Sequence, residues 1–368
     1  MKILAIHNIG FDKKDKESAV QIWRVWRPLE ELKKHVDWQI DYQKGFIKDI
    51  KKYKDLKEFT AEEVEKAGEH LGKYDIVFSS YHADAGADAL IEAVCAKYGT
   101  KYIIDDDDNT FAIDPDNPYW QTMTHDHTFV MQRIMRTARY ISTTTDTLKD
   151  VLQVRSEVDA KIFTLPNYIS DAYSENEFDN GDKIVIGYAG GAQHYNDLHD
   201  TGFLEALQKL MHENKNIYFK CVGVPVDTYT PRARTEIVDV KFGRKWTEEL
   251  FPTLNFDISV APLIDTSFSV CKSNIKWQES TRMGAAFVAS NVEPYSLLAD
   301  GTAVLTPNDS TSWYKALKEL VNDKQKRQKL VKQAKQELQD NWRLEDEKNW
   351  SKYKQMFQEV YDEDNKTK

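Results

Sequence analysis

The segment FDISVAPLIDTSFSVCKSNIKWQES, residues 256 to 280, joins a short apolar run to a polar loop and then to a helix-compatible stretch. The run DISVAPL has the length and composition of a buried strand. The stretch after it stops at Gly284, a residue typical of helix ends. A strand followed by a helix is the repeating unit of α/β proteins with parallel sheets.

The same alternation extends in both directions from this segment. The apolar runs of the first half are KILAIHN, DWQIDYQ, YDIVFSS, KYIIDDD, RYISTTT and KIFTLPNY, and those of the second half are KIVIGYAGG, NIYFKCVGV, IVDVKFG, FDISVAPL, AFVASN and AVLTP. An acidic, Asn/Ser/Gly-rich stretch at 170–182 separates the two sets and suits a linker. From Thr311 onward the pattern is helical. The sequence predicts two α/β domains and a helical tail that packs on one or both of them.

Composition limits the classes of function. The chain has 368 residues, long enough for two domains, and 41% hydrophobic with 30% charged residues indicates a folded protein. The net charge of -10 repels polyanions, so general nucleic-acid binding is not expected. Three widely spaced cysteines favour neither disulfides nor a zinc site, and no apolar run is long enough to span a bilayer. We therefore expect a cytoplasmic protein without a transmembrane segment.

The loop before the predicted helix, which would follow Ser273 and stop at Gly284, is a candidate anion site. Ser273 is predicted to be the N-cap, which would leave the amides of Asn274, Ile275 and Lys276 pointing out of the helix end. Lys272 adds a positive charge beside them. A diphosphate would use both the charge and the amide donors. Ordinary helix capping is the alternative explanation of the same residues.

Two further features point to a nucleotide. Glu279 only accepts hydrogen bonds, which fits the vicinal diol of a ribose, although it could instead pair with Lys276. Gly190 and Gly191 follow a predicted strand, where a backbone without Cβ atoms can approach an anion, although a tight turn without a ligand explains them equally. His194 and Asp197 have the spacing that brings two side chains together on one helix face.

Acidic residues and a histidine end two predicted strands of the first half. Asp105 to Asp108 crowd four carboxylates together, and such neighbours raise one another's pKa. They could position an acceptor hydroxyl, pair with Arg133 or Arg136, collect a divalent ion or form a solvated turn. His82 comes directly after the run YDIVFSS and is either a site residue or a structural histidine.

Residues 257 to 301 resemble the donor-sugar signature of GT-B glycosyltransferases, in particular the family-4-like enzymes with a Glu-x7-Glu pattern. Further segments are similar to the same group and extend the resemblance over most of residues 1 to 340. These segments are WRVWRPLEELKKH, YIIDDDDNTFAIDPDNPYW, RYISTTTDTLKDVL, LPNYIS and GYAGGAQHYNDL. The chain departs from the pattern at Cys271, where the family has its first glutamate, and it lacks the Arg and Lys that many members place after the first donor-domain strand.

The resemblance implies an α/β fold of two Rossmann-like domains that face a cleft. Residues 1–168 would be the acceptor domain, 169–340 the donor domain, and 341–368 a C-terminal helix that packs back on the first domain. The implied activity is transfer of a hexose from a nucleotide diphosphate sugar to an acceptor hydroxyl, with retention, without a metal and without a cofactor. The acceptor could be a glycan, a lipid-linked molecule, a protein or DNA, as in polysaccharide or glycoconjugate biosynthesis. A nucleotide-sugar epimerase and a catalytically silent nucleotide-sugar-binding subunit are the alternatives.

The expected roles follow from this resemblance together with the residue chemistry above. His82, Lys272 and Asp106 are the expected catalytic residues, and Gly10 and Asp107 are expected on the acceptor side. Glu279 would hold the ribose. The expected donor-binding residues are Gly190, Gly191, His194, Lys272, Ser273, Asn274, Ile275, Lys276 and Glu279.

Overall fold

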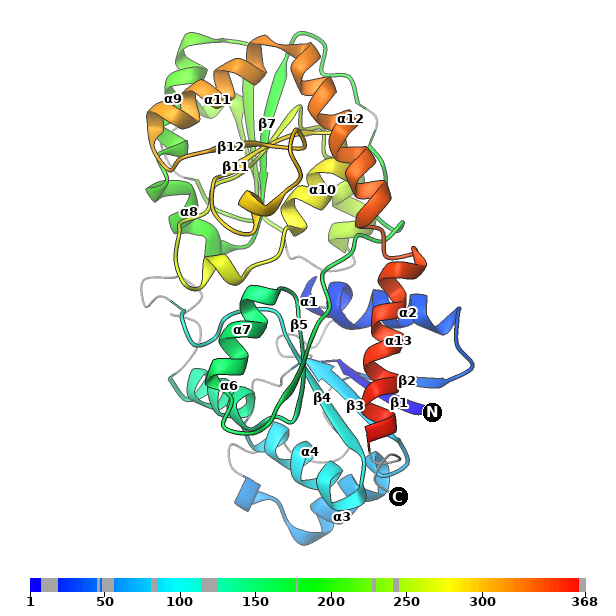
Figure 1. Cartoon of the computed structure of the whole chain (residues 1–368). Coiled ribbons are helices and arrows are strands. Elements are labelled where there is room, and N and C mark those ends of the chain that lie inside the picture. The colour runs from blue at the N-terminus through cyan, green and yellow to red at the C-terminus, as the bar shows by residue number, and fades with distance from the viewer. Residues whose placement is uncertain are drawn as a thin grey trace. The chain divides into compact units, whose positions relative to one another are not determined.

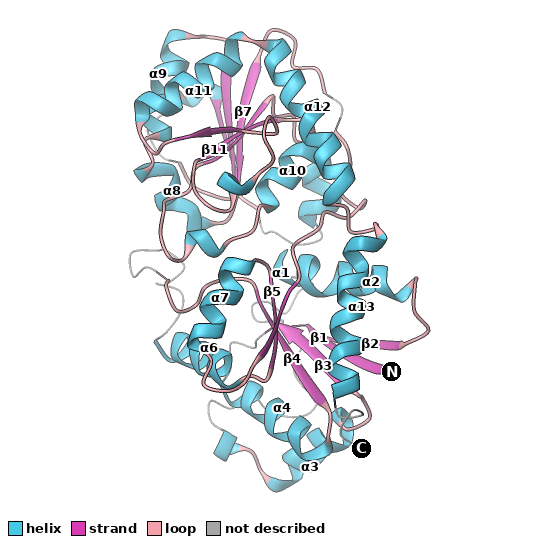
Figure 2. Cartoon of the chain, viewed as in Figure 1, coloured by secondary structure: helices cyan, strands magenta, loops and turns pink. Residues whose placement is uncertain are grey.

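The computed structural model describes residues 1–7, 19–44, 47, 56–80, 85–113, 125–176, 178–226, 230–240 and 245–363. The chain divides into two compact units. Unit 1 comprises Met1–Ala112, Met123–Asn167 and Leu344–Lys368, and unit 2 comprises Ile113–Thr122 and Tyr168–Arg343. Each unit contains one six-stranded parallel sheet with helices beside it (Figures 1 and 2).

The sheet of unit 1 has the strand order β2-β1-β3-β4-β5-β6, and all neighbouring strands are parallel. Its strands are β1 (Lys2–His7), β2 (Gln39–Lys44), β3 (Ile76–Ser80), β4 (Lys101–Asp106), β5 (Tyr140–Thr143) and β6 (Lys161–Thr164). Its helices are α1 (Ala19–Gln21), α2 (Arg27–Lys33), α3 (Ala61–Leu71), α4 (Ala85–Tyr98), α6 (His125–Thr137), α7 (Asp146–Arg155) and α13 (Glu347–Asp362).

Helices α2 and α13 cover one face of this sheet. Trp350, Tyr353 and Phe357 of α13 are buried in one cluster with Leu29 of α2 and Phe78 of β3. The last helix of the chain thus belongs to the core of unit 1, as predicted for a tail that returns to the first domain. Figure 1 shows α13 beside α2, and α6 and α7 on the other side of the sheet.

The sheet of unit 2 has the strand order β12-β11-β10-β7-β8-β9. Its strands are β7 (Ile184–Ala189), β8 (Ile217–Val222), β9 (Thr235–Val238), β10 (Ile258–Ala261), β11 (Ala286–Ser290) and β12 (Val304–Thr306). Its helices are α8 (Tyr195–Asp200), α9 (Phe203–Glu213), α10 (Ile275–Met283), α11 (Ser310–Asn322) and α12 (Lys324–Asn341). Numbered within the unit, this is the order 3-2-1-4-5-6 of Rossmann folds, in which ligands bind where the order reverses. That point is the carboxyl end of β7 and β10.

The prediction of two Rossmann-like α/β units is confirmed, and the local differences have physical causes. In the region of the segment WRVWRPLEELKKH, the chain forms a π-helical turn, Ile22–Trp26, followed by α2 with Pro28 in its first turn. Proline has no amide hydrogen for an intrahelical bond, which favours such an irregularity. Strand β9 spans Thr235–Val238, so it begins two residues before the run IVDVKFG and ends at the second residue of that run.

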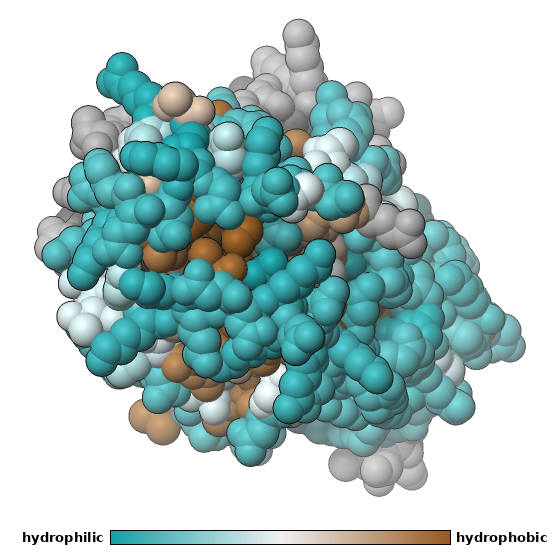
Figure 3. All heavy atoms as spheres, turned by 90° about the horizontal axis from the view of Figure 1, so that it is seen from above, coloured by the Kyte–Doolittle hydropathy of each residue, from teal (hydrophilic) through white to brown (hydrophobic). Residues whose placement is uncertain are grey.

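The face drawn in Figure 3 is mainly hydrophilic. It shows hydrophobic residues only in limited areas between hydrophilic ones. Within the described ranges, no helix combines the length and hydropathy that crossing a bilayer requires.

Candidate functional site

The first turn of α10 lies at the point where the strand order of unit 2 reverses. The helix begins at Ile275 and its N-cap is Asn274, so the prediction of Ser273 as the cap is wrong by one residue. The Asn274 side chain turns into the helix and accepts a hydrogen bond from Gln278 Nε2 at 2.7 Å. In the part of the chain that the structure describes, the amides of Asn274, Ile275 and Lys276 donate no hydrogen bond to the backbone. The predicted row of amide donors is therefore present at this helix end.

Lys276 reaches from α10 to the carboxyl end of β7. Its Nζ donates to the carbonyl of Ala189 at 2.8 Å and lies 4.9 Å from the ring centroid of Tyr188. A Cβ at Gly190 would lie 2.4 Å from both Lys276 Nζ and the Tyr188 hydroxyl. A side chain at 190 would thus have to displace the Lys276 ammonium or the Tyr188 ring. Burial lowers the pKa of Lys276 to about 8, against the attraction of Glu279 and Asp197.

Glu279 lies one turn further along α10 and is held by an indole. Trp246 Nε1 donates to Glu279 Oε1 at 2.9 Å. Burial raises the pKa of the Glu279 carboxyl, and the hydrogen bonds from Trp246 and Tyr173 and the charge of Lys276 oppose this. The carboxylate is therefore fixed in one orientation with acceptor capacity left for a hydroxyl.

His194 and Asp197 form the pair that their spacing predicted. His194 Nδ1 lies 2.7 Å from Asp197 Oδ2, and Asp197 Oδ1 accepts from the amide of Ile264 at 2.9 Å. Burial and the charge of Lys276 lower the pKa of His194 to about 4, so the imidazole is neutral at pH 7. With Nδ1 donating to the carboxylate, Nε2 is the acceptor nitrogen.

Lys272 borders a small hollow next to this pair. The hollow has a volume of about 60 Å³ and is also lined by His194, Asp197 and Phe268. Lys272 Nζ lies 4.2 Å from the Phe268 ring centroid. Cys271, which precedes it, is 1% exposed, and its thiol faces the carbonyl of Ser267 at 3.5 Å. The side chain at the position of the missing glutamate is therefore turned into the protein.

Asp105 and Asp106, at the end of β4, differ in their hydrogen bonding. Arg24 donates from Nε to Asp105 Oδ2 at 3.0 Å and from Nη2 to Oδ1 at 2.7 Å, and Ser142 donates to Oδ1 at 2.6 Å. Arg24 also donates to Leu165 O and Asn167 Oδ1. The partner of Asp105 is thus Arg24, and the alternatives Arg133 and Arg136 are wrong for this residue. Arg136 instead pairs with Glu157 at 3.3 Å.

Asp106 differs from its neighbour although it is equally buried. Burial raises the pKa of its carboxyl well above the ordinary range, and the charges of Asp107 and Asp108 raise it further. Both effects favour the protonated form of the carboxyl, and its Oδ2 has no hydrogen-bond partner in the described protein. Asp107 is partly exposed. The predicted residues Gly10 and His82 lie outside the described residues.

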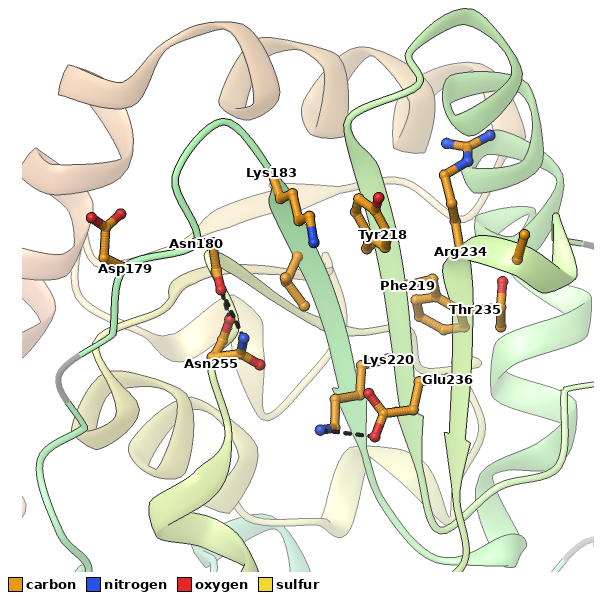
Figure 4. A pocket seen from close by; sticks show the side chains of 12 residues that line it. Asp179, Asn180, Lys183, Tyr218, Phe219, Lys220, Arg234, Thr235, Glu236 and Asn255 are labelled. Carbon is orange, nitrogen blue, oxygen red and sulfur yellow. Dashed lines mark hydrogen bonds and ion pairs between the residues drawn. The ribbon is translucent and has the colours of Figure 1, made fainter.

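Another pocket in unit 2, of about 420 Å³, contains none of the predicted residues (Figure 4). Lys183, Tyr218 and Thr235 line it near the amino ends of their strands, which is the opposite edge of the sheet from α10's first turn. Arg234 donates to the carbonyls of Met211, Asn214 and Ile217. It caps α9 and lies beside this second pocket.

Sequence reasoning missed three residues that shape these sites, namely Arg24, Tyr188 and Trp246. The run IVIGYAGG signals that Tyr188 ends a strand beside the glycines, so its proximity to Gly190 could have been predicted. No local signal links Trp246 to Glu279 or Arg24 to Asp105, because those pairs are 33 and 81 residues apart. Within the described residues, no group of three His, Cys, Asp or Glu side chains is arranged to hold a metal ion.

The fold is shared with solved glycosyltransferase structures. Sucrose-phosphate synthase from Thermosynechococcus elongatus is 13% identical, with a TM-score of 0.65 over 98% of this chain and 99% of the other. HepE from Anabaena, solved with UDP and glucose, is 11% identical with a TM-score of 0.64 over 98% and 99%. A putative UDP-N-acetylglucosamine 2-epimerase from Listeria monocytogenes is 13% identical with a TM-score of 0.55 over 100% and 97%.

No protein-family model matches the chain, and no curated protein matches it. At these low identities the structural similarity establishes the fold. The chain thus has the GT-B fold that its sequence predicted, with two Rossmann-like units.

Proposed function

We propose that the protein is a glycosyltransferase that moves a sugar from a UDP-sugar to an acceptor hydroxyl. The transferred sugar would be a hexose. The observation that carries the proposal is the convergence of anion-binding groups at the carboxyl end of β7. Backbone amides at the start of α10, the Lys276 ammonium and the Gly190 backbone meet there. The neighbours solved with UDP, together with the shared fold, support a diphosphate as the ligand.

The donor diphosphate would lie against the first turn of α10. Its oxygens would accept from the amides of Asn274, Ile275 and Lys276, with Lys272 and Ser273 at the edge. Lys276 would supply the cation that many GT-B enzymes place after the first donor-domain strand, because its Nζ already lies at that strand end. Gly191 and His194 would border the diphosphate or the sugar. Glu279, oriented by Trp246, would hold the ribose diol.

Departure of the diphosphate builds negative charge in the transition state. Fixed amides and ammonium groups at α10 would stabilise this charge without reorganisation. One such donor contributes roughly 3 to 4 kcal/mol in other enzymes. The proposal includes retention of configuration and independence of a metal and of a cofactor. Cys271 in place of the family's first glutamate removes one expected contact with the transferred sugar.

The acceptor side of the proposal concerns the first domain. Residues 1–168 would bind the acceptor and residues 169–340 the donor, with the segment 341–368 completing the first domain. Asp106, Asp107, His82 and Gly10 would face the acceptor or the transferred sugar. A cytoplasmic location is part of the same proposal, and glycans, lipid-linked molecules and proteins are more compatible with the acidic chain than DNA.

A nucleotide-sugar epimerase is the second candidate, because a putative epimerase shares the fold over the full chain. The two activities differ in whether an acceptor is consumed. Incubation with the donor alone would change the sugar in an epimerase. It would release UDP and free sugar slowly in a glycosyltransferase.

The test is a thermal-shift series with nucleotide diphosphate sugars, followed by hydrolysis of the donor that stabilises most. Binding at 100 times Kd stabilises by about 2.7 kcal/mol, a shift of several degrees. Lys272→Ala should abolish most of the turnover, whereas Lys332→Ala, an exposed lysine of α12, should leave it unchanged. If no nucleotide raises the melting temperature and none is hydrolysed, the proposal is wrong.

A further inference from the structure

Two adjacent rows of side chains at the carboxyl end of β4 and β5 contrast in their hydrogen bonding. Asp105 pairs in register with Ser142, and Asp106 with Thr143. Successive side chains of a strand alternate between the two faces of the sheet, so these pairs lie on opposite faces. Asp105 comes two residues after Ile103 and therefore lies on the same face of the sheet. That face is covered by α2 and α13, with which Ile103 is buried. Asp106 and Thr143 therefore lie on the opposite face.

In the first pair, Asp105 and Ser142, the carboxylate has its hydrogen-bond partners within the protein. Its carboxylate accepts two hydrogen bonds from Arg24 and one from Ser142. The guanidinium in turn has further acceptors in Leu165 O and Asn167. A buried charge with this set of partners is typical of a structural ion pair.

The second pair, Asp106 and Thr143, which we call the Asp106 row, lacks such side-chain partners. Asp106 and Thr143 are both 0% exposed, and Asp106 Oδ2 and Thr143 Oγ1 have no partner in the described protein. The same holds for the hydroxyls of Thr110 and Thr144, which come from the loops after β4 and β5. Buried polar atoms without a partner cost free energy, and four of them at one sheet edge are more than packing requires.

The chemistry of these groups defines what they would bind. A threonine hydroxyl donates and accepts hydrogen bonds, as sugar hydroxyls do. The Asp106 carboxyl accepts them, and burial, which raises its pKa, favours the protonated form that can also donate. A phosphate at neutral pH accepts only, and Asp107 and Asp108 beside the site would repel it. The Arg24 charge, which could offset this repulsion, is already paired with Asp105.

We propose that Asp106 and Thr143, with Thr110 and Thr144, form the hydrogen-bonding wall of a site for an uncharged polyhydroxylated molecule, the sugar acceptor of the reaction. The acceptor role rests on the proposed glycosyltransferase function. The preference for a neutral sugar over a sugar phosphate rests on the residues of this row. Thr110, Thr143 and Thr144 thereby become specificity residues that no motif indicated.

The experiment compares Thr143→Val with Ser142→Ala, two hydroxyl deletions at neighbouring positions. Ser142→Ala removes a bond to a buried carboxylate and should lower the melting temperature by about 3 to 8 °C. Thr143→Val replaces an unpartnered hydroxyl with a methyl group, so the melting temperature should stay the same or rise by about 1 to 3 °C. If the Thr143 hydroxyl serves a ligand, the melting temperature should fall in Ser142→Ala but not in Thr143→Val. If Thr143 has a structural role, the melting temperature should fall in both variants.

Binding is measured by calorimetry in the presence of UDP with glucose, fructose and N-acetylglucosamine, each beside its 6-phosphate. At least one neutral sugar should bind more tightly than its phosphate, and Thr143→Val should weaken it about fivefold to tenfold. Asp106→Asn, which keeps a donor and an acceptor, should weaken it less. Equal or better binding of the phosphates, binding of no neutral sugar, or a melting temperature of Thr143→Val lowered like that of Ser142→Ala would overturn the inference.

Donor hydrolysis in the absence of any sugar separates this inference from the function on which it rests. A wild-type protein that binds and hydrolyses UDP-glucose, but shows none of the sugar effects, disproves the acceptor site alone. A wild-type protein that neither binds nor hydrolyses any nucleotide sugar disproves the glycosyltransferase proposal itself.

Discussion

Replacing Gly190 with alanine tests whether Lys276 occupies the carboxyl end of β7. A methyl group at this position would lie 2.4 Å from Lys276 Nζ and 2.4 Å from the Tyr188 hydroxyl. Optimal contacts between such atoms require about 3.5 Å, so each group would have to retreat by about 1 Å. Lys276 is flexible, whereas the Tyr188 ring is 0% exposed and fixed in the core. The ammonium should therefore move more than the ring.

The size of the effect follows from the bond that the ammonium loses. Lys276 Nζ donates to Ala189 O at 2.8 Å, and a hydrogen bond from a charged group contributes about 1.5 to 3 kcal/mol, less where solvent reaches it. We expect Gly190→Ala to lower the free energy of unfolding by about 1 to 3 kcal/mol. UDP affinity should fall about tenfold as the cation leaves the proposed diphosphate site.

The assay is a double-mutant cycle with Lys276→Ala, in which urea unfolding is measured for all four proteins. Without the lysine chain the alanine methyl has more room, so Gly190→Ala should cost at least about 1 kcal/mol less in the Lys276→Ala background. Gly191→Ala is the matched control, because its methyl would meet Gln193 and not the lysine. If the two substitutions are additive within about 0.5 kcal/mol, the ammonium does not lie at this strand end and the reasoning is refuted.

Three further outcomes are expected. Lys272→Ala should reduce turnover about 100-fold with little change in the melting temperature, measured as UDP release. Glu279→Ala should weaken UDP binding about tenfold by calorimetry, and Trp246→Phe, which only frees the carboxylate, should weaken it less; an equal loss in both variants would contradict the ribose role. Burial lowers the pKa of Lys276 to about 8 from the ordinary 10.5, so the unfolded chain binds more protons between these values, and the contribution of this group to stability rises with pH there. UDP affinity should fall over pH 7 to 9 as the cation is lost, and Lys276→Arg should show no such fall; a parallel decline in both proteins would count against the lysine.

The acidic stretch Asp105 to Asp108 shows how far residue patterns reach. Their spacing predicted that neighbouring carboxyls raise one another's pKa, and the pKa of Asp106 is raised, first by burial and then by the charges of Asp107 and Asp108. It did not predict the hydrogen bonds between Asp105 and Arg24, which lies on the π-helical turn 81 residues earlier. The same pattern of four acids therefore contains one carboxylate that is paired with an arginine and one carboxyl whose Oδ2 has no partner in the described protein. Only the contact between two distant segments distinguishes them.

The donor side shows the same division. The helix at 275–283 and its exposed amides were predictable, because capping and helix ends depend on a few consecutive residues. The N-cap is Asn274 and not the predicted Ser273, because the position at which the chain enters helical geometry depends on how the preceding loop packs. That Lys276 fills the space beside Gly190 was not predictable, because the two residues belong to different strand-helix units.

The sequence alone determined the elements, the two α/β units and the final helix, because alternation of apolar runs with amphipathic stretches is a local property and burying those runs leaves few architectures. Tertiary structure alone decided the strand orders, the pairing of Asp105 with Arg24 and of Glu279 with Trp246, and the contact of Lys276 with the end of β7. Those choices depend on which side chains of distant segments meet in a packed interior. The energy of such meetings is set by geometry that no short stretch of sequence contains.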